Sequence, residues 1–217
     1  MSRIPGIAEH EDVFLDIDML PRVRKGGPLI LPWPVPKNPG GMRLFSTATE
    51  WQSFVSNLGI HPGVPEIVAM KFRRAQMLYF LAWIYYDLIK AGELVGLTTL
   101  ELALKDRYGN KGKKSKKSDG RKDKKRKDKK CDERILFADL LNCMVRDDGL
   151  TDDKIPMVRR YGGSVIGFLT GDSKPSLAAI RNSLAHGDPF DGFPYAGMLE
   201  LIRDLIEYAY RDMIRPT

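Results

Sequence analysis

The segment Tyr79-Phe-Leu-Ala-Trp-Ile-Tyr-Tyr86 decides the fold, because it is uncharged and apolar on nearly all sides when wound as a helix. A helix with this pattern is buried in the centre of a protein rather than laid on its surface. We expect it to extend over residues 66–91, where Gly92 and then Gly96 interrupt the chain. The sequence therefore predicts a core built around one long central helix.

Shorter helices are predicted on either side of this central one. Ser46 or Thr47 is a suitable N-cap for a helix whose apolar face ends at Gly59. Later segments repeat apolar residues at helical spacing, whereas the stretch around Gly162-Gly163 indicates a loosely structured connection. Strand-like alternation is confined to short possibilities in the first 46 residues, so the predicted class is all-α. The further helices are expected at residues 97–108, 135–145, 176–186 and 195–214.

The first 46 residues have the composition of an extended, proline- and glycine-rich arm. Residues 28–36 contain four prolines in nine positions, which removes backbone donors and favours an extended chain. Apolar residues such as Leu31 and Trp33 alternate with these prolines, so we expect the arm to pack along the helical body. The alternative, a proline-rich ligand for a partner domain, lacks a charged anchor. The chain thus divides into an arm, residues 1–46, and a helical domain, residues 47–217.

The positive charge of the chain is concentrated in one segment. The formal net charge is +7, but residues 111–130 alone contain 13 Lys or Arg and 3 Asp, a balance of +10, which leaves −3 for all other residues. This segment has no apolar residue and a heavy load of like charge. We therefore predict that residues 111–131 are a disordered basic insertion between two helices.

The basic insertion is also a candidate for RNA binding. Its cations would attract phosphates with a strong dependence on salt. The alternative is a solvated insertion without a function, which is tolerated because loop length costs little free energy. The candidate RNA-binding residues are Lys113, Lys114, Lys116, Lys117, Arg121, Lys122, Lys124, Lys125, Arg126 and Lys127.

The sequence gives no sign of metal, disulfide or membrane chemistry. Cys131 and Cys143 have neither CxxC nor Cys/His ligand spacing, so no metal site and no cofactor is predicted. The first apolar cluster is interrupted by Asp16 and Asp18, which argues against a secretory signal. The longest apolar stretch, residues 77–89, is shorter than the roughly 20 residues that a bilayer span needs. These features predict a cytoplasmic protein without a membrane partner.

The helix expected at residues 176–186 has two different sides. Leu177, Ile180 and Leu184 fall on one side of a helical wheel and are expected to face the core. Asn182 and His186 are four residues apart and share the opposite side. Pro175 fits the first turn of this helix, and Gly187 with Pro189 is expected to end it.

Arg181 and His186 lie on the same helix but do not point to one place. At about 100° per residue they diverge by roughly 140°. Two arrangements would bring them together: a bend in the C-cap turn at Gly187, or two copies of the helix facing each other across a dimer. Ala179, Ser183 and other small residues on this helix would allow a second helix to approach closely.

The segment Arg181-Asn-Ser-Leu-Ala-His186 resembles the motif of the HEPN family, an Arg, a polar residue that is often Asn, and a His after four to six intervening residues. Members are all-helical bundles that commonly dimerise with the motif at the interface. Many are metal-independent ribonucleases of toxin–antitoxin, abortive-infection or CRISPR defence systems. Some members paired with a nucleotidyltransferase antitoxin have a Tyr where this chain has Pro189, so silencing by modification of such a Tyr is not expected here.

The resemblance implies an HEPN-like bundle in the helical domain, with a homodimer, an RNA substrate and an antitoxin protein as partner. It assigns Arg181, Asn182 and His186 to the catalytic positions. A His can transfer protons near neutral pH, and an Arg offers a planar, bidentate contact to phosphate. A catalytically silent HEPN module that binds nucleotide, RNA or a protein partner is the alternative, and a dimerising scaffold is a more distant one.

Structural interpretations of the same residues remain open from the sequence. His186 could serve as a helix C-cap, where its charge suits the helix dipole. Arg181 could be an ion-pair partner for Glu200 or Asp204. Two groups of residues elsewhere also have structural interpretations. We expect three aromatic side chains in the core or in a dimer interface rather than as base-stacking platforms: Tyr79, Trp83 and Tyr86. We expect four carboxylates in a solvated loop rather than in a metal site: Asp147, Asp148, Asp152 and Asp153.

Overall fold

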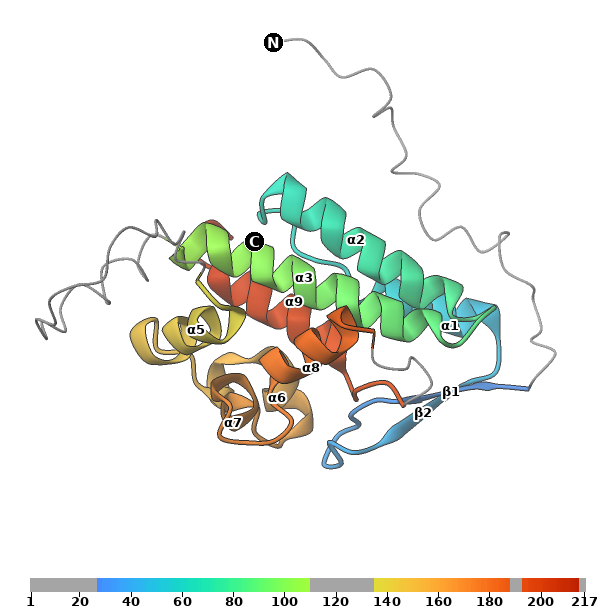
Figure 1. Ribbon diagram of the computed structural model, residues 1–217. Coiled ribbons are helices and arrows are strands. Elements are labelled where there is room, and N and C mark those ends of the chain that lie inside the picture. Colours follow the sequence, from blue (N-terminus) through green and yellow to red (C-terminus); the bar gives the residue numbers. More distant parts are fainter. Residues whose placement is uncertain (1–26, 110–134, 188–192, 215–217) are drawn as a thin grey trace, which may run out of the picture.

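The computed structural model describes residues 27–109, 135–187 and 193–214. The predictions for residues 1–26, for the basic insertion with its RNA-binding residues and Cys131, and for Pro189 lie outside these ranges. The described chain is mainly helical, with a small two-stranded sheet at one end (Figure 1). In these ranges no helix is both long enough and apolar enough to cross a membrane.

Three helices form the centre of the fold. Helix α3 (Leu88–Tyr108) packs against α2 (Glu66–Leu81) on one side and against α9 (Met198–Ala209) on another (Figure 1). Helix α1 (Ala48–Ser56) packs against α2, and its start follows the predicted signal. The side chain of Thr47 accepts from the backbone N–H of Glu50, while the Glu50 carboxylate accepts from the backbone N–H of Thr47.

The predicted single helix over residues 66–91 is wrong, because the chain turns within its most apolar segment. Helix α2 ends at Leu81, and residues 82–87 form the turn that leads into α3. Trp83 stays fully buried in this turn, whereas Ile84 and Tyr85 are 55% and 61% exposed. An apolar run is equally compatible with a continuous buried helix and with a tight turn between two packed helices, and no Gly or Pro marks this one.

Gly92 and Gly96 were expected to end a helix, but α3 continues through both. A Cβ atom at Gly92 would lie 2.6 Å from the ring of Tyr79, and one at Gly96 would lie 2.9 Å from Cδ1 of Ile202. The two glycines therefore allow α2 and α9 to approach α3 closely, and their role is packing rather than termination.

The proline-rich segment folds back on itself as a hairpin instead of forming one extended arm. Strand β1 (Leu29–Pro32) pairs antiparallel with β2 (Met42–Phe45), with Leu29 opposite Phe45. Leu29, Leu31 and Trp33 are fully or almost fully buried, which packs the hairpin onto the helical body. The class is therefore mostly helical with a small sheet.

The connection before the motif helix is more ordered than predicted. Helix α5 (Phe137–Asn142) continues into a π-helical turn, η2 (Cys143–Asp147), and the chain then forms three further short helices. Buried side chains such as Ile155 and Leu169 attach them to the core. Gly162 ends the second of them with a φ of 82°. The three are η3 (Asp152–Lys154), α6 (Pro156–Tyr161) and α7 (Ile166–Thr170).

Candidate functional site

Helix α8 (Leu177–Ala185) carries the Arg-Asn-Ser-Leu-Ala-His segment. Ser176 is the N-cap and its hydroxyl accepts from the backbone N–H of Ala179, so Pro175 lies before the helix rather than in its first turn as predicted. His186 is the C-cap, and Gly187 follows with a φ of 85°. Helix α8 thus begins directly after its N-cap, Ser176, and ends directly before its C-cap, His186.

The two sides of α8 are as the sequence predicts. Leu177, Ile180 and Leu184 are at most 6% exposed and face the core, where α8 packs against α3 and α5 (Figure 1). Asn182 and His186 are exposed on the other side. Burial of the apolar side therefore fixes the direction in which the polar residues of the motif point.

Arg181 lies at the boundary between these two sides and is held by α3. Its Nη2 forms an ion pair with Oε2 of Glu101, a residue that is only 8% exposed. The other carboxylate oxygen of Glu101 accepts from Nζ of Lys105 at 2.6 Å. The sequence suggested Glu200 or Asp204 as ion-pair partners of Arg181, and that prediction is wrong because both belong to another network.

Arg181 and Asn182 are joined directly, whereas His186 is not joined to either. Nη1 of Arg181 donates to Oδ1 of Asn182 at 3.0 Å. Within the described residues, no hydrogen bond or ion pair connects the imidazole of His186 to these two side chains. One chain therefore assembles the Arg and the Asn of the motif, and the His projects separately from the end of α8.

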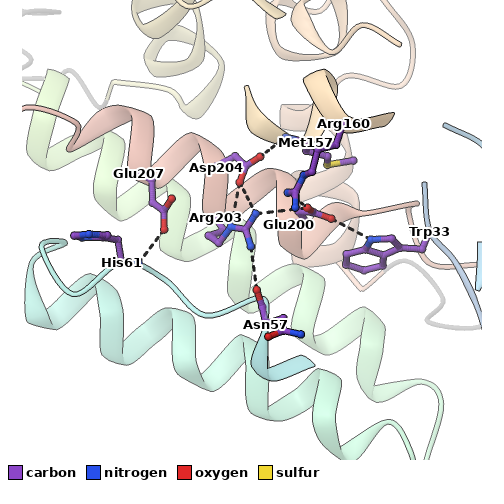
Figure 2. A network of polar contacts seen from close by, with 9 residues as sticks. All are labelled: Trp33, Asn57, His61, Met157, Arg160, Glu200, Arg203, Asp204 and Glu207. Atoms are coloured by element: carbon purple, nitrogen blue, oxygen red, sulfur yellow. Dashed lines mark hydrogen bonds and ion pairs between the residues drawn. The ribbon is translucent and has the colours of Figure 1, made fainter. Parts of the chain in front are cut away.

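A second polar cluster lies on α9. It contains Glu200 and Asp204, the two residues that the sequence suggested as partners of Arg181. Figure 2 shows Glu200 between the indole of Trp33, which donates to it at 3.1 Å, and the guanidinium of Arg160. Burial raises the pKa of Glu200, and the charges of Arg160 and Arg203 oppose this shift. Asp204 accepts from Arg203 at 2.7 Å and from the backbone N–H of Met157, also at 2.7 Å.

This α9 network connects distant parts of the chain. Arg203 also donates to the backbone carbonyl of Asn57 at 3.3 Å, and Glu207 accepts from the backbone N–H of His61 at 2.8 Å (Figure 2). The hairpin, the loop between α1 and α2, and α6 are thereby all tied to α9. Since the buried charges are paired within the protein, we interpret the network as structural.

A cleft of about 570 Å³ opens beside the α9 network. Both signs of charge line it, and two of the lining residues are paired with each other: Arg211 donates to Asp148 at 2.7 Å. The residues of the Arg-Asn-Ser-Leu-Ala-His segment do not line this cleft. Its lining is Asp148, Asp153, Lys154, Pro156, Arg159, Asp204, Glu207, Tyr208, Arg211 and Ile214.

Several of the aromatic residues and carboxylates singled out from the sequence are held by contacts within the protein. Tyr79 and Trp83 are at most 1% exposed and belong to the core, as expected. Asp148 and Asp152 were expected in a solvated loop, but both accept hydrogen bonds from the protein: Asp148 from the hydroxyl of Tyr108, and Asp152 from Ser164 and the backbone N–H of Val165. In the described part of the chain, no three His, Cys, Asp or Glu side chains are grouped so as to hold a metal ion.

Two buried glutamates of α3 were missed by sequence reasoning. Glu101 contacts Arg181, and Glu93 is fully buried, where it accepts from the backbone N–H of Tyr195 at 2.6 Å and pairs with Lys90 at 3.2 Å. Burial raises the pKa of Glu93 to about 7, and the charge of Lys90 only partly offsets this. In the sequence, each Glu has a Lys three or four residues away, a spacing typical of surface ion pairs.

Comparisons with family models, with curated proteins and with solved structures give no match for this chain.

Proposed function

We propose that the chain is a metal-independent endoribonuclease of HEPN type, with Arg181, Asn182 and His186 as its catalytic residues. The observation that carries the proposal is the arrangement of α8: a buried apolar side fixes the helix, and the motif residues occupy its exposed side and its boundary. Arg181 is oriented by Glu101 and linked to Asn182, so a planar cation stands at a defined place beside the exposed surface.

The proposed reaction uses the RNA's own 2′-hydroxyl as nucleophile. A base removes its proton while the oxygen attacks the adjacent phosphorus, and the bond to the 5′-oxygen breaks as an acid protonates that leaving oxygen. The products are a 2′,3′-cyclic phosphate and a 5′-hydroxyl. In this scheme His186 transfers a proton, Arg181 stabilises the negative charge of the phosphorane, and Asn182 orients the phosphate or the imidazole.

The proposal includes a homodimer. Arg181 and His186 diverge along α8, and no hydrogen bond joins them in the described part of one chain. A second copy of α8 would supply the missing partner to each. Ala179 and Ala185 are exposed on α8 and small enough for a second helix to approach closely. We further propose that the enzyme is the toxin of a toxin–antitoxin or phage-defence system, with an antitoxin protein as partner.

The test is cleavage of total RNA by the purified protein with EDTA present. We expect wild type to cut, His186→Ala to be inactive with an unchanged thermal transition, and Arg181→Lys to be severely impaired, because an ammonium keeps the charge but loses the planar fork. Asn182→Ala should be milder. His61→Ala is the matched control: it removes an imidazole outside the motif and should retain cleavage. A monomer mass by light scattering at micromolar concentration would argue against the shared site.

The alternative is a catalytically inactive HEPN module that binds nucleotide, RNA or a protein partner. One observation favours it: His186 is the C-cap of α8, a position that has a structural use of its own. If wild type cuts no RNA and His186→Ala melts several degrees lower, the imidazole is a cap and the enzyme proposal fails.

A further inference from the structure

The carboxylate of Glu101 lies under the motif and binds two cations at once. It comes from α3, 80 residues before Arg181 in the chain, and each of its oxygens faces one cation: Oε2 faces Arg181 and Oε1 faces Lys105. The side chain of Glu101 is 10% exposed, that of Arg181 is 26% exposed and that of Lys105 is 51% exposed. The buried anion thus sits beneath two cations that reach toward the surface.

This arrangement holds the guanidinium without using all of its donors. A guanidinium has five N–H groups, two on each Nη and one on Nε. Arg181 uses one donor on Nη2 for Glu101 and one on Nη1 for Asn182, and its Nε is buried without a hydrogen-bond partner. One N–H on each Nη is left over and can donate to the oxygens of a phosphate.

Fixing the plane of this guanidinium in advance matters for catalysis. A cation stabilises a phosphorane most when it already points to the place where the charge develops, because nothing then has to be reordered during the reaction. Arg181 has a long side chain, and its only ion-pair partner among the described residues is Glu101. Without that carboxylate, the buried part of the guanidinium would lose its compensating charge and the side chain its fixed orientation.

We propose that Glu101 is a positioning residue that sets the orientation of Arg181 for stabilising the phosphorane, with Lys105 sharing the same carboxylate. The inference rests on the proposed ribonuclease function and adds a residue that the motif does not contain. The proposal also predicts different effects on RNA affinity and on cleavage rate, which a general stabilising role of Glu101 does not. Removing the negative charge of Glu101 should leave RNA binding unchanged or tighter, because the site becomes more positive, while the cleavage rate falls.

The test compares Glu101→Gln with wild type in two measurements. The first is single-turnover cleavage of a short RNA, where we expect the rate to fall about 10- to 100-fold, the loss that follows when a catalytic group is misplaced by about 1 Å. The second is binding of the same oligonucleotide with 2′-deoxy residues, which cannot be cleaved; its affinity should be unchanged or higher. Glu93→Gln is the matched control, since it neutralises another buried glutamate of α3 that does not contact Arg181, and it should cleave at the wild-type rate.

A double-mutant cycle shows whether Glu101 acts through Arg181. In an Arg181→Ala background, adding Glu101→Gln should change the residual rate less than twofold. Glu101→Asp, which keeps the charge on a shorter side chain, should cleave faster than Glu101→Gln but more slowly than wild type. It replaces Glu101→Gln in the cleavage assay if the Gln variant does not fold.

Four results would overturn the inference. If wild type cuts RNA and Glu101→Gln cuts equally fast, only the positioning role is lost. If the rate and the affinity fall together, or if Glu101→Gln has its full effect without Arg181, Glu101 is a structural residue. If wild type cuts no RNA at all, the proposed function fails and the inference fails with it.

Discussion

Replacing Glu93 by Gln should remove a large pH dependence from the stability of this protein. The Glu93 side chain is fully buried on α3, and burial raises its pKa from 4.5 to about 7. Between these two pH values the unfolded chain has released a proton that the folded chain still holds. The free energy of unfolding therefore falls as pH rises through this window, and a pKa difference of this size corresponds to about 3 kcal/mol.

The direction of this pH dependence is set by the larger of two opposing effects on the pKa of Glu93. Desolvation of the carboxylate disfavours the charged form, whereas Lys90 at 3.2 Å and the backbone N–H of Tyr195 at 2.6 Å favour it. Burial is the larger effect on the pKa of Glu93. Glu93→Gln keeps the shape of the side chain and cannot ionise, so it should gain stability relative to wild type as pH rises.

Urea unfolding of wild type and Glu93→Gln at pH 4.5, 6 and 8 measures this difference. The Gln variant should gain about 3 kcal/mol relative to wild type between the lowest and the highest pH. Glu66→Gln, at an exposed position in the first turn of α2, controls for the change in net charge. A difference that stays constant with pH, or that grows in favour of wild type, would show that the Lys90 ion pair outweighs burial and would refute the reasoning.

Two further predictions concern the hairpin and the basic insertion. Trp33 and Trp51 are both fully buried, but the indole of Trp33 donates to the carboxylate of Glu200, and that of Trp51 to the backbone carbonyl of Phe80. Because hydrogen bonds to charged groups contribute more, Trp33→Phe should cost about 1 kcal/mol more than Trp51→Phe in urea unfolding. Deleting residues 111–130 should leave the thermal transition unchanged and weaken RNA binding, with a shallower salt dependence in filter-binding titrations; unchanged affinity and slope would remove the insertion from the proposed RNA-binding surface.

The helical content of this protein could be predicted from its sequence because amphipathic spacing and caps are local signals. The start of α1 at Thr47 and the limits of α8 between Ser176 and Gly187 follow from a few adjacent residues, and the structure confirms them. The turn after Leu81 could not be predicted in this way. Ala82 and Trp83 are buried while Ile84 and Tyr85 are exposed, yet all four are apolar or aromatic, so the sequence pattern does not separate this turn from a buried helix.

Long-range packing accounts for the other differences. Gly92 and Gly96 look like helix breakers in isolation, and only the neighbouring Tyr79 and Ile202 show that the missing side chains make room for α2 and α9. The hairpin, likewise, is held by Trp33 and its partner on α9, a contact across 167 positions that no local pattern contains. Tertiary contacts of this kind override local preference.

For the candidate site, too, the local features could be predicted from the sequence and the long-range contacts could not. The exposed face with Asn182 and His186 follows from the spacing of the buried Leu177, Ile180 and Leu184. The partner of Arg181 does not, because Glu101 lies on another helix and its spacing to Lys105 suggests an ordinary surface pair. The role of a buried glutamate in a central helix becomes clear only when the tertiary structure shows which side chain faces it.

The geometry of α8 assigns different roles to the motif residues. At about 100° per residue, Arg181 lies roughly 70° from the centre of the buried side, at the boundary where α3 can reach it, and Glu101 does so. Asn182 and His186 lie more than about 150° from that centre, where no residue of the packed core can reach them. Among the described residues, Glu101 of α3 therefore fixes the Arg, and in the proposed enzyme the His would be completed by substrate or by a second copy of the chain. A dimer that joins two α8 helices would satisfy both requirements, since each copy brings one oriented Arg and one free His.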